Sequence, residues 1–391
     1  MKKLLFLTFV LLVGTKLFAQ FQPQKLSEQS EISLLTISPG EELWSFAGHT
    51  AIRVKDPVQG IDVNFNYGVF DFRKESFYLK FLRGTLPYEI GAYNFRDETP
   101  YWISENRKVT QQVLNLNQEQ KQRFFDFLME NYQPENREYR YKFFYDNCST
   151  RVRDVLEYAT GDSLQFSQTL NAEKSFRDWI KISSQKSNND WSEFGMDLLI
   201  GVPADETTNA YRAMFIPDNL MAAFDSAKIR RNGEWFPLVQ TKYDLNMASN
   251  ESKSLPIKPF MFFAILFLAF LFISYRESQS GKWYLSLDKV LFTLTGLCGF
   301  IFLLLWFFTD HGVTEYNWNV LWALPILFPL ALFVKKKAKQ PLVKKVFLVQ
   351  MVMVIALLLL FKFLPQTFNV AILPIAGIVL MRSYLVWKRM I

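Results

Sequence analysis

The spacing of apolar and polar residues divides the chain into two halves of different character. In the first half, short alternating runs at residues 31–37, 50–55, 61–69 and 108–116 are typical of strands. Apolar residues at helical spacing cover 118–132 and 149–159, with Asn117 before the first helix and Gly161 after the second. We therefore predict an α+β domain over residues 20–250, with a polar surface loop at 183–190 and a linker at 246–256.

The second half consists mainly of long apolar stretches. They cover about residues 256–275, 289–309, 320–334, 346–363 and 370–387. Each is close to the roughly 20 residues that a helix needs to cross a bilayer. The third is the shortest and contains Pro325 and Pro329. We expect an all-α transmembrane domain of about five helices over residues 256–391.

Charge is unequally distributed between the halves and indicates an orientation. The chain has a net charge of +7, but residues 256–391 hold 14 Lys/Arg against 4 Asp/Glu, whereas residues 20–255 hold 27 against 33. The basic residues of the apolar half cluster after its first and third stretches and at the C-terminus, while the loops near 310–319 and 364–369 have none. Because cytoplasmic loops are rich in Lys and Arg, residues 20–255 should face outward and the C-terminus should be cytoplasmic. The basic excess therefore reports membrane topology, and we expect no nucleic-acid partner.

The N-terminus has the features of a secretory signal peptide. Lys2 and Lys3 precede the apolar run 4–13, and Ala19 provides a small residue before a cut at Gln20. We predict a signal peptide over residues 1–19, with a retained membrane anchor as the alternative.

Two residues in the exported half have the contexts that a thiol–imidazole pair requires. The chain contains two His and two Cys, and Cys298 lies inside an apolar stretch. Cys148 follows Asp146 and Asn147, either of which can cap a helix, so its thiol should lie in the first helical turn, where the dipole favours the thiolate. His49 follows Gly48 at the start of a predicted strand. Taken singly, a structural His and an inert buried Cys are the ordinary interpretations. Together they favour Cys148 as a nucleophile and His49 as its base.

A third group should orient the imidazole. Asn66, or Asn64 on the same face of the next strand, is the candidate, with Asp71 behind it.

Two arginines on the predicted nucleophile helix are candidates for binding phosphate. Arg151 and Arg153 lie close together there and suit an anionic headgroup. The equally good alternative is that they form ion pairs with Asp154 or Glu157.

Three segments carry a resemblance to a known family. The segments AGHTAIRVKD, NFNYGVFDF and FFYDNCSTRVRD resemble the Lnb N-terminal periplasmic domain, a permuted papain-like domain related to NlpC-type and lecithin:retinol acyltransferase-like proteins. The resemblance extends to the membrane tail, through Asp310-His311, Asn317-Trp318-Asn319 and Pro325. Gly312 follows His311 where the family pattern has Pro.

The resemblance implies a location and an activity. It implies a multi-pass protein of the bacterial inner membrane whose catalytic domain lies in the periplasm. It also implies a lipoprotein N-acyltransferase that moves an acyl chain from a phospholipid to the α-amine of a diacylglyceryl-cysteine lipoprotein. Cys148 and His49 match the catalytic pair, and Cys148 would carry the acyl chain as a thioester. Asp310, His311 and Glu315 would lie at the outward mouth of the membrane domain, where they position a headgroup or hold the interface. Thioester-to-amide exchange needs neither metal nor cofactor.

Two other classes of function use the same residues differently. A periplasmic cysteine peptidase or amidase acting on cell-wall peptides would use the same Cys–His pair. A non-enzymatic membrane assembly factor would contain Cys148 only incidentally, so that Cys148→Ala leaves its function intact.

Overall fold

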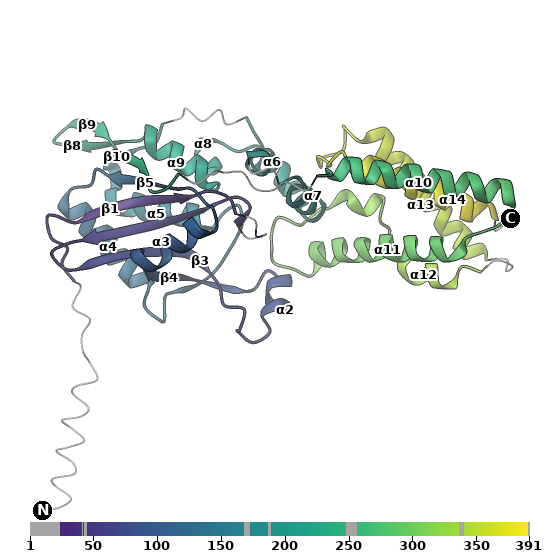
Figure 1. Cartoon of the computed structure of the whole chain (residues 1–391), viewed down its shortest axis with the longest axis horizontal. Coiled ribbons are helices and arrows are strands. Elements are labelled where there is room, and N and C mark those ends of the chain that lie inside the picture. The colour runs from purple at the N-terminus through teal and green to yellow at the C-terminus, as the bar shows by residue number, and fades with distance from the viewer. Residues whose placement is uncertain are drawn as a thin grey trace, which may run out of the picture.

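A seven-stranded antiparallel sheet forms the centre of the N-terminal half (Figure 1). The computed structural model describes residues 24–40, 42, 45–167, 173–186, 189–247, 256–335 and 340–389. The predicted signal peptide and most of the predicted linker lie outside the described residues. The sheet order is β10-β5-β1-β2-β3-β4-β6. Its strands are β1 (Glu31–Ile37), β2 (His49–Asp56), β3 (Ile61–Val69), β4 (Pro87–Asn94), β5 (Val109–Leu114), β6 (Glu138–Arg140) and β10 (Val239–Asp244).

Two layers of helix cover opposite faces of this sheet. On one face, α4 (Gln118–Asn131) and α5 (Cys148–Thr160) pack on each other, and α5 also contacts β2 and β3. On the other face, α3 (Phe95–Ser104) contacts β3, β4 and β5. Because side chains alternate along a strand, even-numbered residues of β2 face α5 and odd-numbered ones face α3. Ile52 accordingly joins the core beneath α5, and Ala51 joins the small core beneath α3.

Further elements complete the N-terminal half. They are α2 (Phe77–Leu82), α6 (Phe176–Lys186), α7 (Asp190–Leu199), α8 (Ala210–Ala213), α9 (Pro217–Ser226), the 3₁₀ turns η2 (Gly161–Ser163) and η3 (Val202–Asp205), and a small sheet of β7 (Leu164–Gln165), β8 (Lys228–Arg231) and β9 (Glu234–Pro237). The predicted surface loop at 183–190 is wrong in its first part, since α6 continues to Lys186. Phe176 and Ile180, one turn apart, are buried on one face of that helix, which accounts for its formation despite the polar run that follows.

The apolar half folds into helices. Among the described residues, three helices are long and apolar enough to cross a membrane: α10 (Pro259–Ser280), α11 (Leu285–Phe307) and α13 (Pro341–Leu360). The fifth predicted stretch corresponds to α14 (Ile372–Arg389). The third corresponds to the turn η4 (Trp318–Leu321) and the seven-residue helix α12 (Leu327–Phe333), with Pro325 between them. Proline lacks the backbone N–H that a helix requires, so a continuous helix is interrupted there.

Two loops of the apolar half meet the N-terminal half. From the loop after α11, the carbonyl of Val313 accepts a hydrogen bond from the Gly201 backbone N–H at 2.9 Å. From the loop after α13, Asn369 Nδ2 donates to Asp197 Oδ2 at 3.1 Å. The C-terminus of α14 lies at the far end of the helices, away from the sheet (Figure 1). The loops that join α11 to η4 and α13 to α14 therefore lie on the same side as the N-terminal half.

Candidate active site

Cys148 is the first residue of α5, held there by an asparagine cap. Asn147 Oδ1 accepts hydrogen bonds from the backbone N–H groups of Ser149 and Thr150, at 2.8 and 2.9 Å. Its Nδ2 donates to the Phe215 carbonyl at 2.8 Å, which fixes the cap to the rest of the domain. The Cys148 residue is 8% exposed. The predicted first-turn position is present, with Asn147 rather than Asp146 as the cap.

His49 is the first residue of β2, directly after a tight approach of two backbones. Gly48 has a φ of +87°, and a Cβ at this position would lie 2.7 Å from the Ile37 carbonyl oxygen, so only glycine fits. The next residue joins β2 to α5: the Thr50 hydroxyl lies 2.9 Å from that of Ser149, and its backbone N–H hydrogen-bonds to Cys148. The end of the strand and the start of the helix are thereby held against each other.

Each of the two side chains favours the charged form of the other. Burial of the Cys148 thiol opposes its ionisation, but the charge of His49, a hydrogen bond from it, and hydrogen bonds from Thr50 and Ser149 together lower the thiol's pKa. Burial likewise opposes protonation of His49, but the charge of Cys148 and the same hydrogen bond raise the imidazole's pKa. The site therefore favours thiolate and imidazolium together, the reactive state of a thiol nucleophile.

A polar chain continues behind the imidazole. His49 Nε2 lies 2.8 Å from Asn66 Oδ1, an acceptor, so this nitrogen carries a proton and leaves Nδ1 for the thiol. Asn66 Nδ2 donates to both carboxylate oxygens of Glu98, at 3.1 and 3.0 Å. Asn64 Nδ2 donates to the same carboxylate at 3.0 Å. Of the two predicted orienting residues, Asn66 contacts the imidazole directly. Asn64 contacts the Glu98 carboxylate that also binds Asn66.

The position predicted for Asp71 is occupied by Glu98. Asp71 lies in the turn after β3 and pairs with Arg73 at 2.9 Å, so the prediction that it stands behind the asparagine is wrong. Glu98 and Trp102 lie one turn apart on α3, and the Trp102 ring centroid is 6.3 Å from that of His49. The buried indole shields the imidazole from water. Neither residue carried a sequence signal, because their contact with His49 requires α3 to fold over the sheet.

Two other residues near the thiol were not predicted. The Tyr141 side chain hydrogen-bonds with Cys148, and burial, followed by the thiolate's charge, raises the pKa of its phenol. Arg107 is 6% exposed, and its charge acts on both His49 and Cys148. Tyr141 stands seven residues before the nucleophile, in the aromatic run that leads into the helix cap, and this proximity is the signal that could have drawn attention to it.

The predicted phosphate-binding arginines are engaged in ion pairs. Arg151 Nε lies 2.6 Å from Asp146 Oδ1, and its guanidinium stacks on Tyr139. Arg153 Nη2 lies 2.7 Å from Asp154 Oδ1, one of the pairings that the alternative interpretation predicts.

His311 lies in the loop after α11 and contacts α2. Its Nε2 is 3.0 Å from the Leu82 carbonyl oxygen, at the end of α2. The preceding Asp310 pairs with Arg140 at 2.7 Å and with Lys142 at 3.1 Å. These contacts tie the outward loop of the membrane helices to the N-terminal half.

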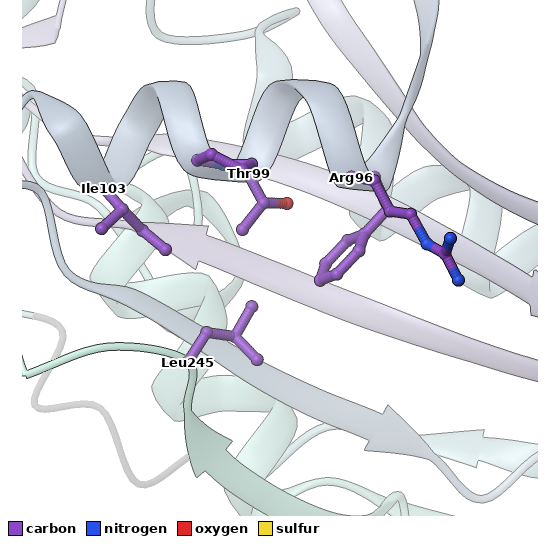
Figure 2. A pocket seen from close by; sticks show the side chains of 6 residues that line it. Arg96, Thr99, Ile103 and Leu245 are labelled. Atoms are coloured by element: carbon purple, nitrogen blue, oxygen red, sulfur yellow. The ribbon is translucent and has the colours of Figure 1, made fainter.

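A surface hollow of about 390 Å³ lies between α3 and Leu245, the residue after β10. Figure 2 shows Thr99 and Ile103 of α3 facing Leu245 across it. Neither Cys148 nor His49 lines this hollow, so it contributes no group to the chemistry. Within the part of the chain that the structure describes, no group of three His, Cys, Asp or Glu side chains is placed to hold a metal ion.

Comparison with protein families assigns both halves of the chain. Residues 17–184 match the family model described as the Lnb N-terminal periplasmic domain, and residues 250–390 match the model described as the Lnb transmembrane domain. The chain belongs to the Lnb family. Searches of curated proteins and of solved structures found no match.

Membership fixes the broad role and location of the protein. The Lnb domain family is associated with lipoprotein N-acylation, so the chain is a membrane protein of lipoprotein maturation. Its N-terminal domain is periplasmic, and the three long apolar helices belong to its membrane part. The candidate dyad of Cys148 and His49 lies in the periplasmic domain.

Proposed function

We propose that this Lnb protein is a lipoprotein N-acyltransferase that takes an acyl chain from a phospholipid and transfers it to the α-amine of a diacylglyceryl-cysteine. The observation that carries the proposal is the chain Cys148–His49–Asn66–Glu98, which supplies an activated thiol, a base and the groups that orient the base. These four residues lie in a domain that contacts the loop after the membrane helix α11 directly. Both proposed substrates reside in the membrane.

The arrangement supports a permuted papain-like domain. A papain-like enzyme places its Cys at a helix start and its His on a facing strand, and Cys148 and His49 occupy these positions at the starts of α5 and β2. The His precedes the Cys along the chain, so the order is permuted. We assign this domain to residues 20–250 and the transmembrane domain to residues 256–391.

In the first half-reaction, the Cys148 thiolate attacks the carbonyl carbon of a phospholipid ester. An S–C bond forms, and the tetrahedral intermediate then breaks its bond to the glycerol oxygen. The His49 imidazolium donates its proton to that oxygen, which leaves as the hydroxyl of a lysophospholipid. The acyl chain remains on Cys148 as a thioester.

In the second half-reaction, the free α-amine of the lipoprotein attacks the thioester carbonyl. His49, now neutral, removes a proton from the attacking nitrogen, and the C–S bond breaks to give the amide. Sγ departs as a thiolate beside the newly formed imidazolium, so the resting ion pair is restored. The exchange of a thioester for an amide is downhill and consumes no cofactor.

The oxyanion of both tetrahedral intermediates requires donors next to Sγ. The backbone N–H of Cys148 lies at the positive end of α5, and the Tyr141 hydroxyl is already within hydrogen-bonding distance of the sulfur. We assign these two groups to the oxyanion.

Five crossings of the inner membrane and a cytoplasmic C-terminus fit the arrangement of the helices. The loops that contain Val313 and Asn369 both contact the periplasmic domain, which supports an outward position for each. The segment η4–α12 then accounts for the third crossing and α14 for the fifth. A single Cys added after Ile391, in a variant with Cys148 and Cys298 replaced by serine, should resist a membrane-impermeant maleimide in intact spheroplasts. Labelling without lysis would contradict this topology.

The direct test is mass spectrometry of a lipoprotein N-terminus. Cells that depend on this protein should make lipoprotein with an N-acyl chain, and cells carrying Cys148→Ala should make lipoprotein one acyl chain lighter. An unchanged acyl number with Cys148→Ala would overturn the proposal and favour the assembly-factor alternative. Loss of cell-wall peptide cleavage with an unchanged acyl number would favour the peptidase.

A further inference from the structure

The segment between β3 and β4 presents an exposed apolar surface. This segment, residues 70–86, contains α2 and is called here the aromatic excursion. Its apolar side chains that are at least 42% exposed are Phe72, Tyr78, Leu79, Phe81 and Leu82. Arg73 and Arg83 flank them and are also exposed. A water-soluble surface rarely exposes so many neighbouring apolar groups without a partner.

The aromatic excursion is fixed to the outward end of the membrane helices. The Asp310 backbone N–H donates to the Arg83 carbonyl at 2.8 Å, and His311 contacts the Leu82 carbonyl. Gly84 has a φ of +65°, and a Cβ there would come within 2.8 Å of the His311 backbone nitrogen. The backbones of residues 84 and 311 therefore lie so close together that only glycine fits at position 84. Figure 1 shows α2 projecting from the sheet toward the membrane helices.

The helix end beside it is rich in exposed aromatic residues. Phe307, the last residue of α11, and the following Phe308 are 63% and 74% exposed. Tyr316 in the same loop is 55% exposed and packs on Trp306. Aromatic side chains of this kind collect where a helix leaves the hydrocarbon region of a bilayer. The aromatic excursion therefore adjoins the end of a membrane helix that is rich in exposed aromatic residues.

The inner side of the aromatic excursion leads to the candidate nucleophile. Its buried Phe77 lies 5.9 Å from Phe70, ring centroid to centroid, and Phe70 lies 5.5 Å from Tyr88. Tyr88 stacks on Tyr141 at 4.6 Å, and Tyr141 hydrogen-bonds with Cys148. An unbroken row of rings thus joins the exposed excursion to the thiol.

We infer that the aromatic excursion inserts into the outer leaflet of the membrane and that the aromatic row guides the ester of a phospholipid to Cys148. The occupant of the exposed surface is the lipid itself: apolar side chains enter the acyl region, and Arg83 meets phosphate. The guiding role rests on the proposed function, whereas insertion does not.

Insertion can be measured without catalysis. The full-length protein with Cys148→Ser and Cys298→Ser receives Leu79→Cys, labelled with a fluorophore, in vesicles of phosphatidylethanolamine and phosphatidylglycerol with brominated acyl chains. The matched control is Val58→Cys, since Val58 is 59% exposed like Leu79 but lies in the turn at the opposite end of β3. We expect the bromine atoms to quench the label at position 79 at least about threefold more than at 58. Equal quenching at the two positions would overturn the inference.

The guiding role is tested by removing the apolar face. The variant Tyr78→Ser/Leu79→Ser/Phe81→Ser should transfer acyl chains from vesicle phospholipid at least about tenfold more slowly, because three apolar side chains that would enter the bilayer are lost. Iodoacetamide labelling of Cys148 should stay unchanged, which verifies that the domain is folded. A control variant, Val58→Ser/Trp235→Ser/Tyr243→Ser, removes similarly exposed groups and should transfer at the normal rate.

The possible outcomes separate the two proposals. A triple variant that transfers as fast as the unaltered protein overturns the guiding role. If the unaltered protein transfers no acyl chain while position 79 is strongly quenched, the proposed function fails and insertion stands.

Discussion

Asn66 links the imidazole of His49 to the carboxylate of Glu98: its Oδ1 lies 2.8 Å from His49 Nε2, and its Nδ2 lies 3.1 and 3.0 Å from the two Glu98 oxygens. Because the carboxylate accepts only from the NH₂ group, the amide cannot flip without losing both interactions. Its carbonyl is therefore directed at the imidazole, so that Nε2 keeps its proton and Nδ1 is the nitrogen that gains or loses a proton at the thiol.

Removing the carboxylate should impair the base while leaving the thiol present. We expect Glu98→Ala to lower kcat/KM about tenfold, equivalent to about 1.4 kcal/mol, through loss of hydrogen bonds to a charged acceptor. Glu98→Gln retains an acceptor oxygen and should lose less activity. The measurement is the initial rate of acyl transfer to a lipopeptide, with KM and kcat determined separately. If Glu98→Ala matches the unaltered protein in rate and in pH profile, Glu98 has no positioning role.

The Tyr141 hydroxyl should contribute to the rate rather than to substrate binding. Tyr141→Phe removes a donor to the oxyanion and should lower kcat by about 10²-fold, with little change in KM. Tyr139→Phe is the matched control, since the Tyr139 hydroxyl is buried and has no hydrogen-bond partner among the described residues. Equal kcat values for the two variants would argue against Tyr141 as an oxyanion donor.

The ion pair gives alkylation of Cys148 a defined pH dependence. The lowered thiol pKa means that the thiolate exists above that value and is lost as the pH falls through it. The raised pKa of His49 means that the imidazolium is lost as the pH rises through that value, so the ion pair occupies the interval between the two. In a Cys298→Ser background, iodoacetamide should react with Cys148 well below the usual thiol pKa. His49→Ala should shift the rise in the alkylation rate of Cys148 to higher pH. An alkylation rate with the same pH dependence in both proteins would contradict the pairing.

A buried ion cluster joins three helices of the membrane domain, α10, α11 and α14. Arg382 is fully buried on α14 and pairs at 2.7 Å with Glu277 of α10 and at 2.7 Å with Asp288 of α11. Arg382→Ala removes the cation that two buried carboxylates share, leaving Glu277 with Arg389 at 3.2 Å, and should destabilise the fold by about 3–5 kcal/mol. The triple variant Arg382→Met/Glu277→Gln/Asp288→Asn should recover much of the loss. Thermal unfolding in detergent gives the answer, and equal Tm values for Arg382→Ala and the unaltered protein would be the contrary result.

Local sequence patterns predicted the elements that are built from local information. The strand signals at 50–55 and 61–69 correspond to β2 and β3, and the helix signal at 149–159 corresponds to α5. These succeed because alternation and helix caps act over a few residues. The strand β10 was missed, since five of its six residues are exposed and its pairing with β5 joins segments more than a hundred residues apart.

Only part of the candidate site could be predicted from the sequence, namely the residue types that occur rarely in the chain and stand at a predicted helix or strand start. His49 and Cys148 were found because a strand start and a helix start are visible in sequence. Glu98 was missed, and Asp71 was chosen wrongly, because which carboxylate reaches Asn66 depends on how α3 crosses the sheet. Long-range packing of this kind leaves no periodic signal in the chain.

Trapping the acyl-enzyme tests the central claim most directly. The full-length protein in vesicles of a phospholipid with one defined acyl chain is incubated without lipoprotein, digested, and analysed by mass spectrometry. We predict a peptide containing Cys148 that is heavier by that one acyl group, sensitive to hydroxylamine, absent in Cys148→Ala, and discharged when a lipopeptide with a free α-amine is added. Lipopeptide that becomes N-acylated while Cys148 never carries the chain would contradict the account.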